Sequence, residues 1–156
     1  MSRKSKSSLL VELQSELRAY QQSVDALDEV AARRIGVNRS DLRCLDTLLQ
    51  EGGATPTRLA QRLGLTSGSV TTMIDRLEQA GYAARSPDPA DRRRVLVHPT
   101  PKAIAVAMEI YGPLATAGEQ DTSGYTENDL RLLIDFFRSG RRRQDEQRQS
   151  LTTRTD

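Results

Sequence analysis

The chain is poor in the residues that most active sites and covalent cross-links need. Its 156 residues include one cysteine, Cys44, and one histidine, His98. A single cysteine excludes an internal disulfide, and a lone histidine without Cys, Asp or Glu at ligand spacing does not make a metal site. No nucleophile–base pair and no glycine-rich phosphate loop can be found. An enzyme is therefore the least supported class of function, and we expect no cofactor.

Long apolar runs are also missing. None approaches the ~20 residues that a membrane-spanning helix requires. The basic segment 1–8 is not followed by a signal-like apolar core, so we expect a cytoplasmic protein. The hydrophobic content of 37% and the mean hydropathy of −0.57 suit long helices with exposed faces. The length favours one domain with a core of its own.

The charge is uneven along the chain, although the net charge is only +2. Residues 54–98 carry +3, between −3 for residues 9–53 and −4 for residues 99–137. Residues 1–8 and 138–156 carry +3 each. A positive segment between acidic flanks would concentrate phosphate attraction on one face of the molecule.

The stretch 54–100 organises the rest of the chain, beginning with two short helices joined at a glycine. Thr55 can cap the first helix and Gly64 ends it, because glycine readily takes the left-handed conformation that follows a helix. Thr66 caps the second helix and Gly81 closes it. The apolar side of the second helix consists of Val70, Met73, Ile74 and Leu77.

The opposite side of the second helix is small, polar and suited to close approach. Its members are Ser67, Gly68, Ser69, Thr71, Thr72, Asp75 and Arg76. Such a helix fits the DNA major groove, with its first turn near base edges and its N-terminal N–H groups near phosphate. The alternative is a merely polar surface.

A basic hairpin follows. Residues 82–86 and 95–98 are predicted strands, and residues 87–91 connect them. Arg92, Arg93 and Arg94 come directly after the turn, where a hairpin tip could enter a minor groove. The alternative is a solvated run of charge.

These residues together resemble the MarR family of transcriptional regulators. The matching segments are LAQRLGLTSGSVTTMIDRLEQAGY and RSPDPADRRRVLVHPT. The resemblance implies that Asp91 steadies the wing, that Arg93 enters the minor groove, and that the polar helix face reads the major groove. The family usually has Leu-Thr before the next helix and a glycine three residues after the threonine. This chain has Pro99-Thr100 and Ala103 in those places.

The resemblance also implies an architecture. The fold would be mainly α with a small β-hairpin wing, a winged helix-turn-helix lobe over residues 35–100. N- and C-terminal helices over 9–34 and 101–148 would form a homodimer. Two copies would bind double-stranded DNA at an inverted repeat, and a small-molecule effector often releases repressors of this family.

The flanking segments carry the residues expected at the dimer interface. Ser8 is the predicted cap of a helix over 9–34, whose heptad-like seam is Leu13, Leu17, Tyr20, Val24, Leu27 and Ala31. By periodicity alone this seam could equally face an ordinary core. A second helix is predicted over 39–51 and a third after the Thr100 cap, kinked or ended by Gly112-Pro113. The last helix contributes Leu130, Leu133, Ile134 and Phe137. Segments 1–8 and 149–156 are predicted to be disordered.

The remaining candidates are single residues. Arg58 and Thr66 are expected near phosphate, with Arg62 a weaker candidate. Tyr20 and Tyr111 could line a ligand crevice, although packing is the commoner role. Cys44 could be a redox sensor, but a packing cysteine fits its acidic neighbours better. The alternative overall function is a winged-helix interaction module that binds neither DNA nor ligand.

Overall fold

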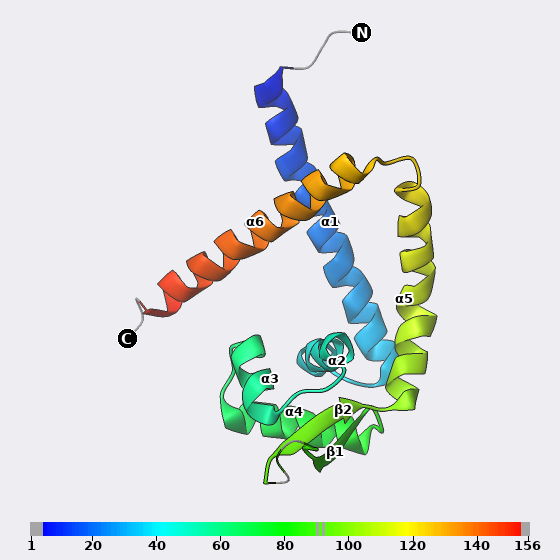
Figure 1. Cartoon of the computed structure of the whole chain (residues 1–156), viewed down its shortest axis with the longest axis vertical. Coiled ribbons are helices and arrows are strands. Elements are labelled where there is room, and N and C mark those ends of the chain that lie inside the picture. The colour runs from blue at the N-terminus through cyan, green and yellow to red at the C-terminus, as the bar shows by residue number, and fades with distance from the viewer. Residues whose placement is uncertain (1–4, 90, 92, 154–156) are drawn as a thin grey trace. The chain divides into compact units, whose positions relative to one another are not determined.

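The computed structural model describes residues 5–89, 91 and 93–153, and of residues 152 and 153 only the backbone. Its elements run in the order α1 to α4, β1, β2, α5 and α6 (Figure 1). Contacts divide the chain into two compact units, Met1–Tyr111 and Gly112–Asp156. The first unit contains the helix-turn-helix and the hairpin, so the predicted fold class, mainly α with a small β wing, is confirmed.

The core of the first unit lies between the short helices and the hairpin. Helices α2 (Arg39–Glu51), α3 (Pro56–Leu63) and α4 (Ser67–Gln79) each bury one apolar face. The largest fully buried apolar side chains are Leu48, Leu59, Ile74, Leu77, Val70 and Val97. All four predicted apolar positions of α4 are buried, which turns the polar side of this helix outward.

The caps that the sequence predicts set the bounds of both helix-turn-helix helices. Thr55 Oγ1 accepts from the Arg58 N–H at 3.2 Å, and Thr66 Oγ1 accepts from the Ser69 N–H at 3.3 Å. Gly64 ends α3 in the left-handed conformation, with φ of 67°. A side-chain oxygen at the N-cap satisfies one of the N–H groups that the first helical turn leaves unpaired. The turn therefore has a fixed start, a fixed end and a fixed length.

The wing is a two-stranded antiparallel hairpin. Strands β1 (Ala83–Pro87) and β2 (Val95–Pro99) pair so that Ala83 faces Pro99 and Pro87 faces Val95. An isolated bridge between Ala54 and Val97 adds the α2–α3 connection to the edge of β2, with both N–H···O distances at 2.9 Å. The first strand starts one residue later than predicted, because the Tyr82 N–H donates to the Leu77 carbonyl of α4 at 2.8 Å. The buried Tyr82 side chain directs its hydroxyl to the Ile35 carbonyl at 3.2 Å.

Helix α1 (Lys6–Ile35) begins earlier than predicted. Ser5, not Ser8, is the N-cap, and its hydroxyl accepts from the Ser8 N–H at 3.2 Å. Residues 6–8 are therefore helical rather than part of a disordered arm, and residues 1–4 of that arm lie outside the described residues. The predicted start is wrong because Ser5 and Ser8 can both cap a helix, and a cap at Ser5 makes the helix about one turn longer.

Two further boundaries differ from the prediction. Helix α5 (Pro101–Asp121) starts at the predicted Thr100 cap but continues through Gly112 and Pro113, so the helix does not end there. Alanine and leucine on both sides favour helix strongly enough to offset the N–H that proline lacks. Helix α6 (Glu127–Thr153) extends past residue 149, where a disordered tail was predicted, and residues 154–156 lie outside the described residues. Charged residues at helical spacing sustain this end.

Candidate nucleic-acid interface

The exposed side of α4 presents hydroxyl groups. Ser67, Ser69 and Thr72 are solvent-exposed, and a Cβ added at Gly68 would meet nothing within 4 Å. Thr72 donates its hydroxyl to the Gly68 carbonyl at 3.1 Å, and Thr71 donates to the Ser67 carbonyl at 3.0 Å. With the hydrogen atoms used inside the helix, the hydroxyl lone pairs remain as acceptors pointing outward. This surface can accept hydrogen bonds from base amino groups in a major groove.

Arg76, which is predicted to contact the major groove, forms an ion pair within the protein. Its guanidinium donates to Asp41 on α2 through two bonds, Nε to Oδ2 at 2.8 Å and an Nη to Oδ1 at 2.6 Å. The Arg76 side chain is 44% exposed, whereas Asp41 is buried. The hydrogen bond to the carboxylate raises the pKa of Arg76 further above its ordinary value. Arg76 is thus at the surface but already paired.

The hairpin tip is held by its own backbone and by one side chain. Asp88 N–H donates to the Arg94 carbonyl at 2.9 Å, and Arg94 N–H donates to the Asp91 carbonyl at 2.8 Å. Asp91 Oδ1 accepts from the Arg93 N–H at 3.1 Å, a local bond typical of aspartate in turns. The side chains of Arg93 and Arg94 are exposed. Arg92, the remaining arginine of the predicted wing, lies outside the described residues.

Arg85 joins the wing to the recognition-type helix, a contact that the sequence reasoning missed. Its backbone N–H donates to Glu78 at 2.9 Å, its guanidinium pairs with the same carboxylate, and another Nη meets Asp75 at 2.7 Å. Asp75 and Glu78 stand three residues apart, so they share one side of α4. The chain turns back after Gly81, and this places a β1 residue beside them. The sequence contained one signal for this contact: two carboxylates on the same side of α4 and an arginine on the strand that follows.

The two arginines of α3 have an acidic partner. Arg58 Nε lies 3.3 Å from Glu51 and Arg62 Nε lies 3.0 Å from it. Both arginine side chains are more than half exposed. Ion pairs as exposed as these contribute little to stability, so either guanidinium can turn to a phosphate at small cost.

Comparison with known proteins decides the family. The sequence model of the MarR family matches residues 37–95. The uncharacterized HTH-type transcriptional regulator YcgE of Bacillus subtilis is 38% identical over 108 residues, 69% of this chain and 70% of that protein. The chain belongs to the MarR family. It is accordingly a DNA-binding transcriptional regulator and not an enzyme.

Solved structures of MarR-type regulators share the fold. The transcriptional regulator Tm0710 of Thermotoga maritima superimposes with a TM-score of 0.61 at 25% identity, covering 86% of this chain and 95% of that one. A cysteine-to-serine variant of MarR from E. coli, complexed with operator DNA, gives a TM-score of 0.54 at 21% identity, covering 87% and 98%. The second likeness supports the fold alone.

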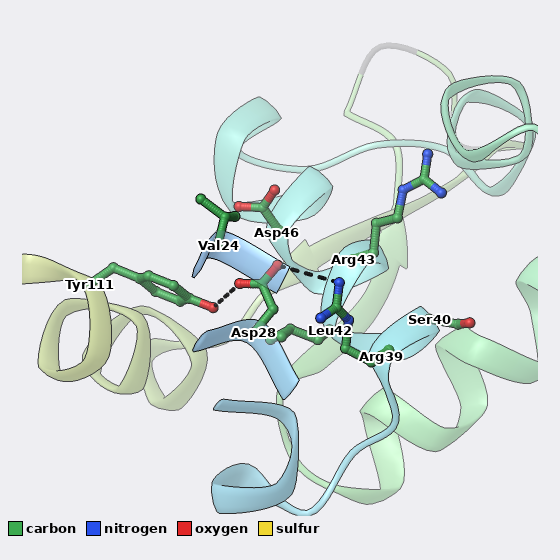
Figure 2. Close-up of a pocket in the computed structure, with 8 residues that line it drawn as sticks. All are labelled: Val24, Asp28, Arg39, Ser40, Leu42, Arg43, Asp46 and Tyr111. Carbon is green, nitrogen blue, oxygen red and sulfur yellow. Dashed lines mark hydrogen bonds and ion pairs between the residues drawn. The ribbon is translucent and has the colours of Figure 1, made fainter. Parts of the chain in front are cut away.

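A pocket of about 480 Å³ opens within the first unit of this MarR-family chain (Figure 2). Its lining residues are Val24, Asp28, Arg39, Ser40, Leu42, Arg43, Asp46 and Tyr111. The Tyr111 hydroxyl donates to Asp28 Oδ1 at 3.0 Å, and Arg39 reaches Asp28 at 3.9 Å and Asp25 at 2.8 Å. Burial, followed by the bond to Asp28 and its charge, raises the pKa of Tyr111 to about 12.

The two tyrosines predicted to share a ligand crevice are not brought together. Tyr111 lines the pocket, but Tyr20 does not and is 65% exposed on α1. The two residues stand almost a hundred positions apart, and helical periodicity places a side chain on a face without showing which element faces it. A crevice that includes Tyr20 is therefore excluded for this pocket.

Cys44 is packed inside the core. Its side chain has no exposed surface. Burial, and then the negative charge of Asp41, raise the pKa of the Cys44 thiol to about 11. A neutral, inaccessible thiol is inert, so the geometry fits the packing role and disfavours the redox-sensor alternative.

Apolar side chains remain uncovered on both terminal helices. On α1, Leu13 is 43% exposed, and only Ala31 and Ala32 are buried. On α6, a groove of about 500 Å³ is lined by Leu130, Leu133, Ile134, Phe137, Arg138 and Arg141. Single exposed apolar residues are ordinary, but contiguous ones mark interaction surfaces.

Across the described part of the chain, every helix is too short or too polar to span a bilayer. Among the same residues, no group of three or more His, Cys, Asp or Glu side chains is placed to hold a metal ion.

Proposed function

We propose that the protein is a homodimeric repressor that binds an inverted repeat of double-stranded DNA. The exposed face of α4 reads the major groove through Ser67, Ser69 and Thr72. The wing tip places Arg93 and Arg94 in the flanking minor groove. One observation carries the proposal: Arg85 fixes the cationic hairpin beside the hydroxyl-bearing helix, so both belong to one surface.

Dimerisation is supported by the apolar faces left open on α1 and α6. The seam residues Leu13, Leu17 and Tyr20 and the groove residues Leu130, Leu133 and Phe137 would be covered by a second copy. A two-fold dimer places two α4 helices in successive major grooves about 34 Å apart, which requires an operator with two-fold symmetry. Arg58 and the α4 N-terminus at Thr66 would meet phosphates between these contacts.

A small-molecule effector is the finer part of the proposal. The pocket at Tyr111 and Asp28 is large enough for a compact ligand and offers an aromatic wall beside charged groups. A ligand that binds better when the two α4 helices are wrongly spaced for DNA would release the operator, and a coupling of about 1–3 kcal/mol is sufficient. Such a regulator acts in the cytoplasm, on the chromosome.

The test is DNA binding by the full chain with a matched pair of arginine variants. The DNA is the duplex that the wild-type chain selects from a random-sequence pool. Arg93→Ala should weaken binding to this duplex by about 1–3 kcal/mol and make the affinity less dependent on salt. Arg33→Ala removes the same charge from α1, where Arg33 forms an ion pair with the exposed Glu29, and should leave affinity nearly unchanged. Equal affinities for all three proteins would remove the minor-groove role of the wing. A wild-type chain that binds no duplex even at low salt would instead favour the interaction-module alternative.

A further inference from the structure

Asp41 is the single charged side chain that is buried within the described part of the chain. Only 2% of it is exposed, yet no buried polar side-chain atom among the described residues lacks a hydrogen-bond partner. The partner of both carboxylate oxygens is Arg76, at 2.8 and 2.6 Å. A buried carboxylate is costly to leave unpaired, so this pair fixes where Arg76 must be.

The pair joins α2 and α4, two helices that also pack against each other in the apolar core. Asp41 lies in the first turn of α2, and Arg76 follows Thr72 by one helical turn on α4. Beside the pair, a hollow of about 490 Å³ separates the start of α2 from α4, lined by Asn38, Arg39, Ser40, Ser69, Thr72, Met73 and Arg76. Arg76 lines this hollow, and its pair with Asp41 joins α2 to α4 at the surface, beside the apolar contacts that the two helices share in the core.

The geometry of the pair restricts rotation. Apolar side chains pack without strong directional preference, whereas two parallel N–H···O bonds between a guanidinium and a carboxylate fix both distance and angle. A rotation of α4 about its own axis would break at least one of these bonds. The direction in which Ser69 and Thr72 point is therefore tied to the position of Asp41.

We propose that Asp41 is a positioning residue for DNA recognition and that Arg76 acts through it rather than by reading a base. This inference rests on the proposed role of α4 as the recognition helix. If Arg76 turned to a base, it would leave the Asp41 carboxylate buried and unpaired, and that cost opposes the exchange. The buried apolar face of α4 turns its polar side outward, the pair holds the helix at one rotation within that limit, and the hydroxyl groups of the preceding turns meet the bases.

The experiment is a double-mutant cycle on DNA affinity with Asp41→Asn, Arg76→Gln and the double variant. Affinity is measured for the duplex that the wild-type chain selects from a random-sequence pool and for an unrelated duplex. Loss of a negative charge near DNA would by itself raise affinity for both. We expect Asp41→Asn to lower affinity for the selected duplex about fivefold or more, with the unrelated duplex not weakened. The double variant should bind no more weakly than the weaker single variant.

Glu29→Gln is the matched control, because it also removes one carboxylate, which is half exposed and forms its ion pair with Arg33 on the same helix, α1. It should not reduce the ratio of selected to unrelated binding. If Asp41→Asn does not fold, Arg76→Lys replaces it in the comparison, because lysine keeps the charge and loses the two-bond geometry. A merely structural role would lower the unfolding midpoint and leave the affinity ratio of the folded protein unchanged.

Three results would overturn the inference. One is an unchanged ratio for the folded Asp41→Asn protein. Another is additive losses in the cycle, and the third is a loss of preference at one base pair on Arg76→Gln alone, which would identify Arg76 as a base contact. A wild-type chain that selects no duplex would overturn the proposed function itself, so the two failures are distinguishable.

Discussion

Gly53 lies so close to β2 at the base of the wing that a side chain at this position would not fit. A Cβ built there would lie 2.7 Å from Nδ1 of His98 and 3.2 Å from the carbonyl oxygen of Val97. The backbone φ of 140° is also one that residues with a side chain rarely adopt. Replacement by alanine must therefore strain the backbone and displace β2 or His98, whose Nε2 lies 2.8 Å from the Ser86 hydroxyl.

The neighbouring Gly52 provides the matched control. Its φ is 69°, again left-handed, but a Cβ there would meet nothing within 4 Å. Gly52→Ala should cost only the conformational term, about 1 kcal/mol of unfolding free energy. Gly53→Ala adds a stronger backbone strain and a lost or displaced hydrogen bond, which together give about 3 kcal/mol.

Urea unfolding followed by circular dichroism measures both variants on the same scale. Because the two changes are chemically identical and adjacent, effects on the unfolded chain largely cancel between them. Equal losses for the two variants would show that the close approach of Gly53 to β2 does not limit this region. The inference that a side chain at position 53 would displace His98 or β2 would then be refuted.

Three further results are expected. Ile74→Ala should lower stability by about 2–5 kcal/mol in thermal or urea unfolding, since the side chain is fully buried in the core beneath the exposed face of α4; a loss below about 0.5 kcal/mol would contradict that burial. Cys44 should resist alkylation in the native protein at pH 8 and react in urea. The raised pKa favours the neutral thiol in the folded state, so the stability that Cys44 contributes is complete below pH 9 and is lost as pH rises toward 11. Cys44→Ala should therefore make the unfolding free energy less dependent on pH over that range. An unchanged pH profile would count against burial of the thiol as the cause. Analytical ultracentrifugation should show the proposed dimer for the wild-type chain and a monomer for Leu133→Asp; a dimer unaltered by the substitution would place the interface elsewhere, and a monomeric wild-type chain would refute dimerisation.

Local signals predicted most of the DNA-binding lobe. Thr55, Thr66 and Gly64 act through bonds that span only a few residues, so the sequence alone defines the two short helices. The apolar side of α4 follows from periodicity for the same reason. The prediction of the second helix, 39–51, was also confirmed at both ends.

The long-range pairs could not be predicted from local signals in the same way. Arg76 and Asp41 are 35 positions apart, and nothing in the spacing of either marks the other as its partner. The pocket at Tyr111 forms only when α1, α2 and α5 are brought together, so a tyrosine on one helix could not be matched to the right neighbours. The ends of α1 and α6 were misjudged because polar helices and disordered tails share a composition.

The attachment of β1 to α4 through Arg85 has a consequence for operator architecture. If α4 and the hairpin contact DNA as proposed, this attachment would make the protein set the register between each half-site and the minor groove beside it. A base pair inserted between them would rotate that groove by about 34° away from the hairpin. In the proposed two-fold dimer, tolerance for altered spacing would then come from the centre of the operator, between the two copies of α4.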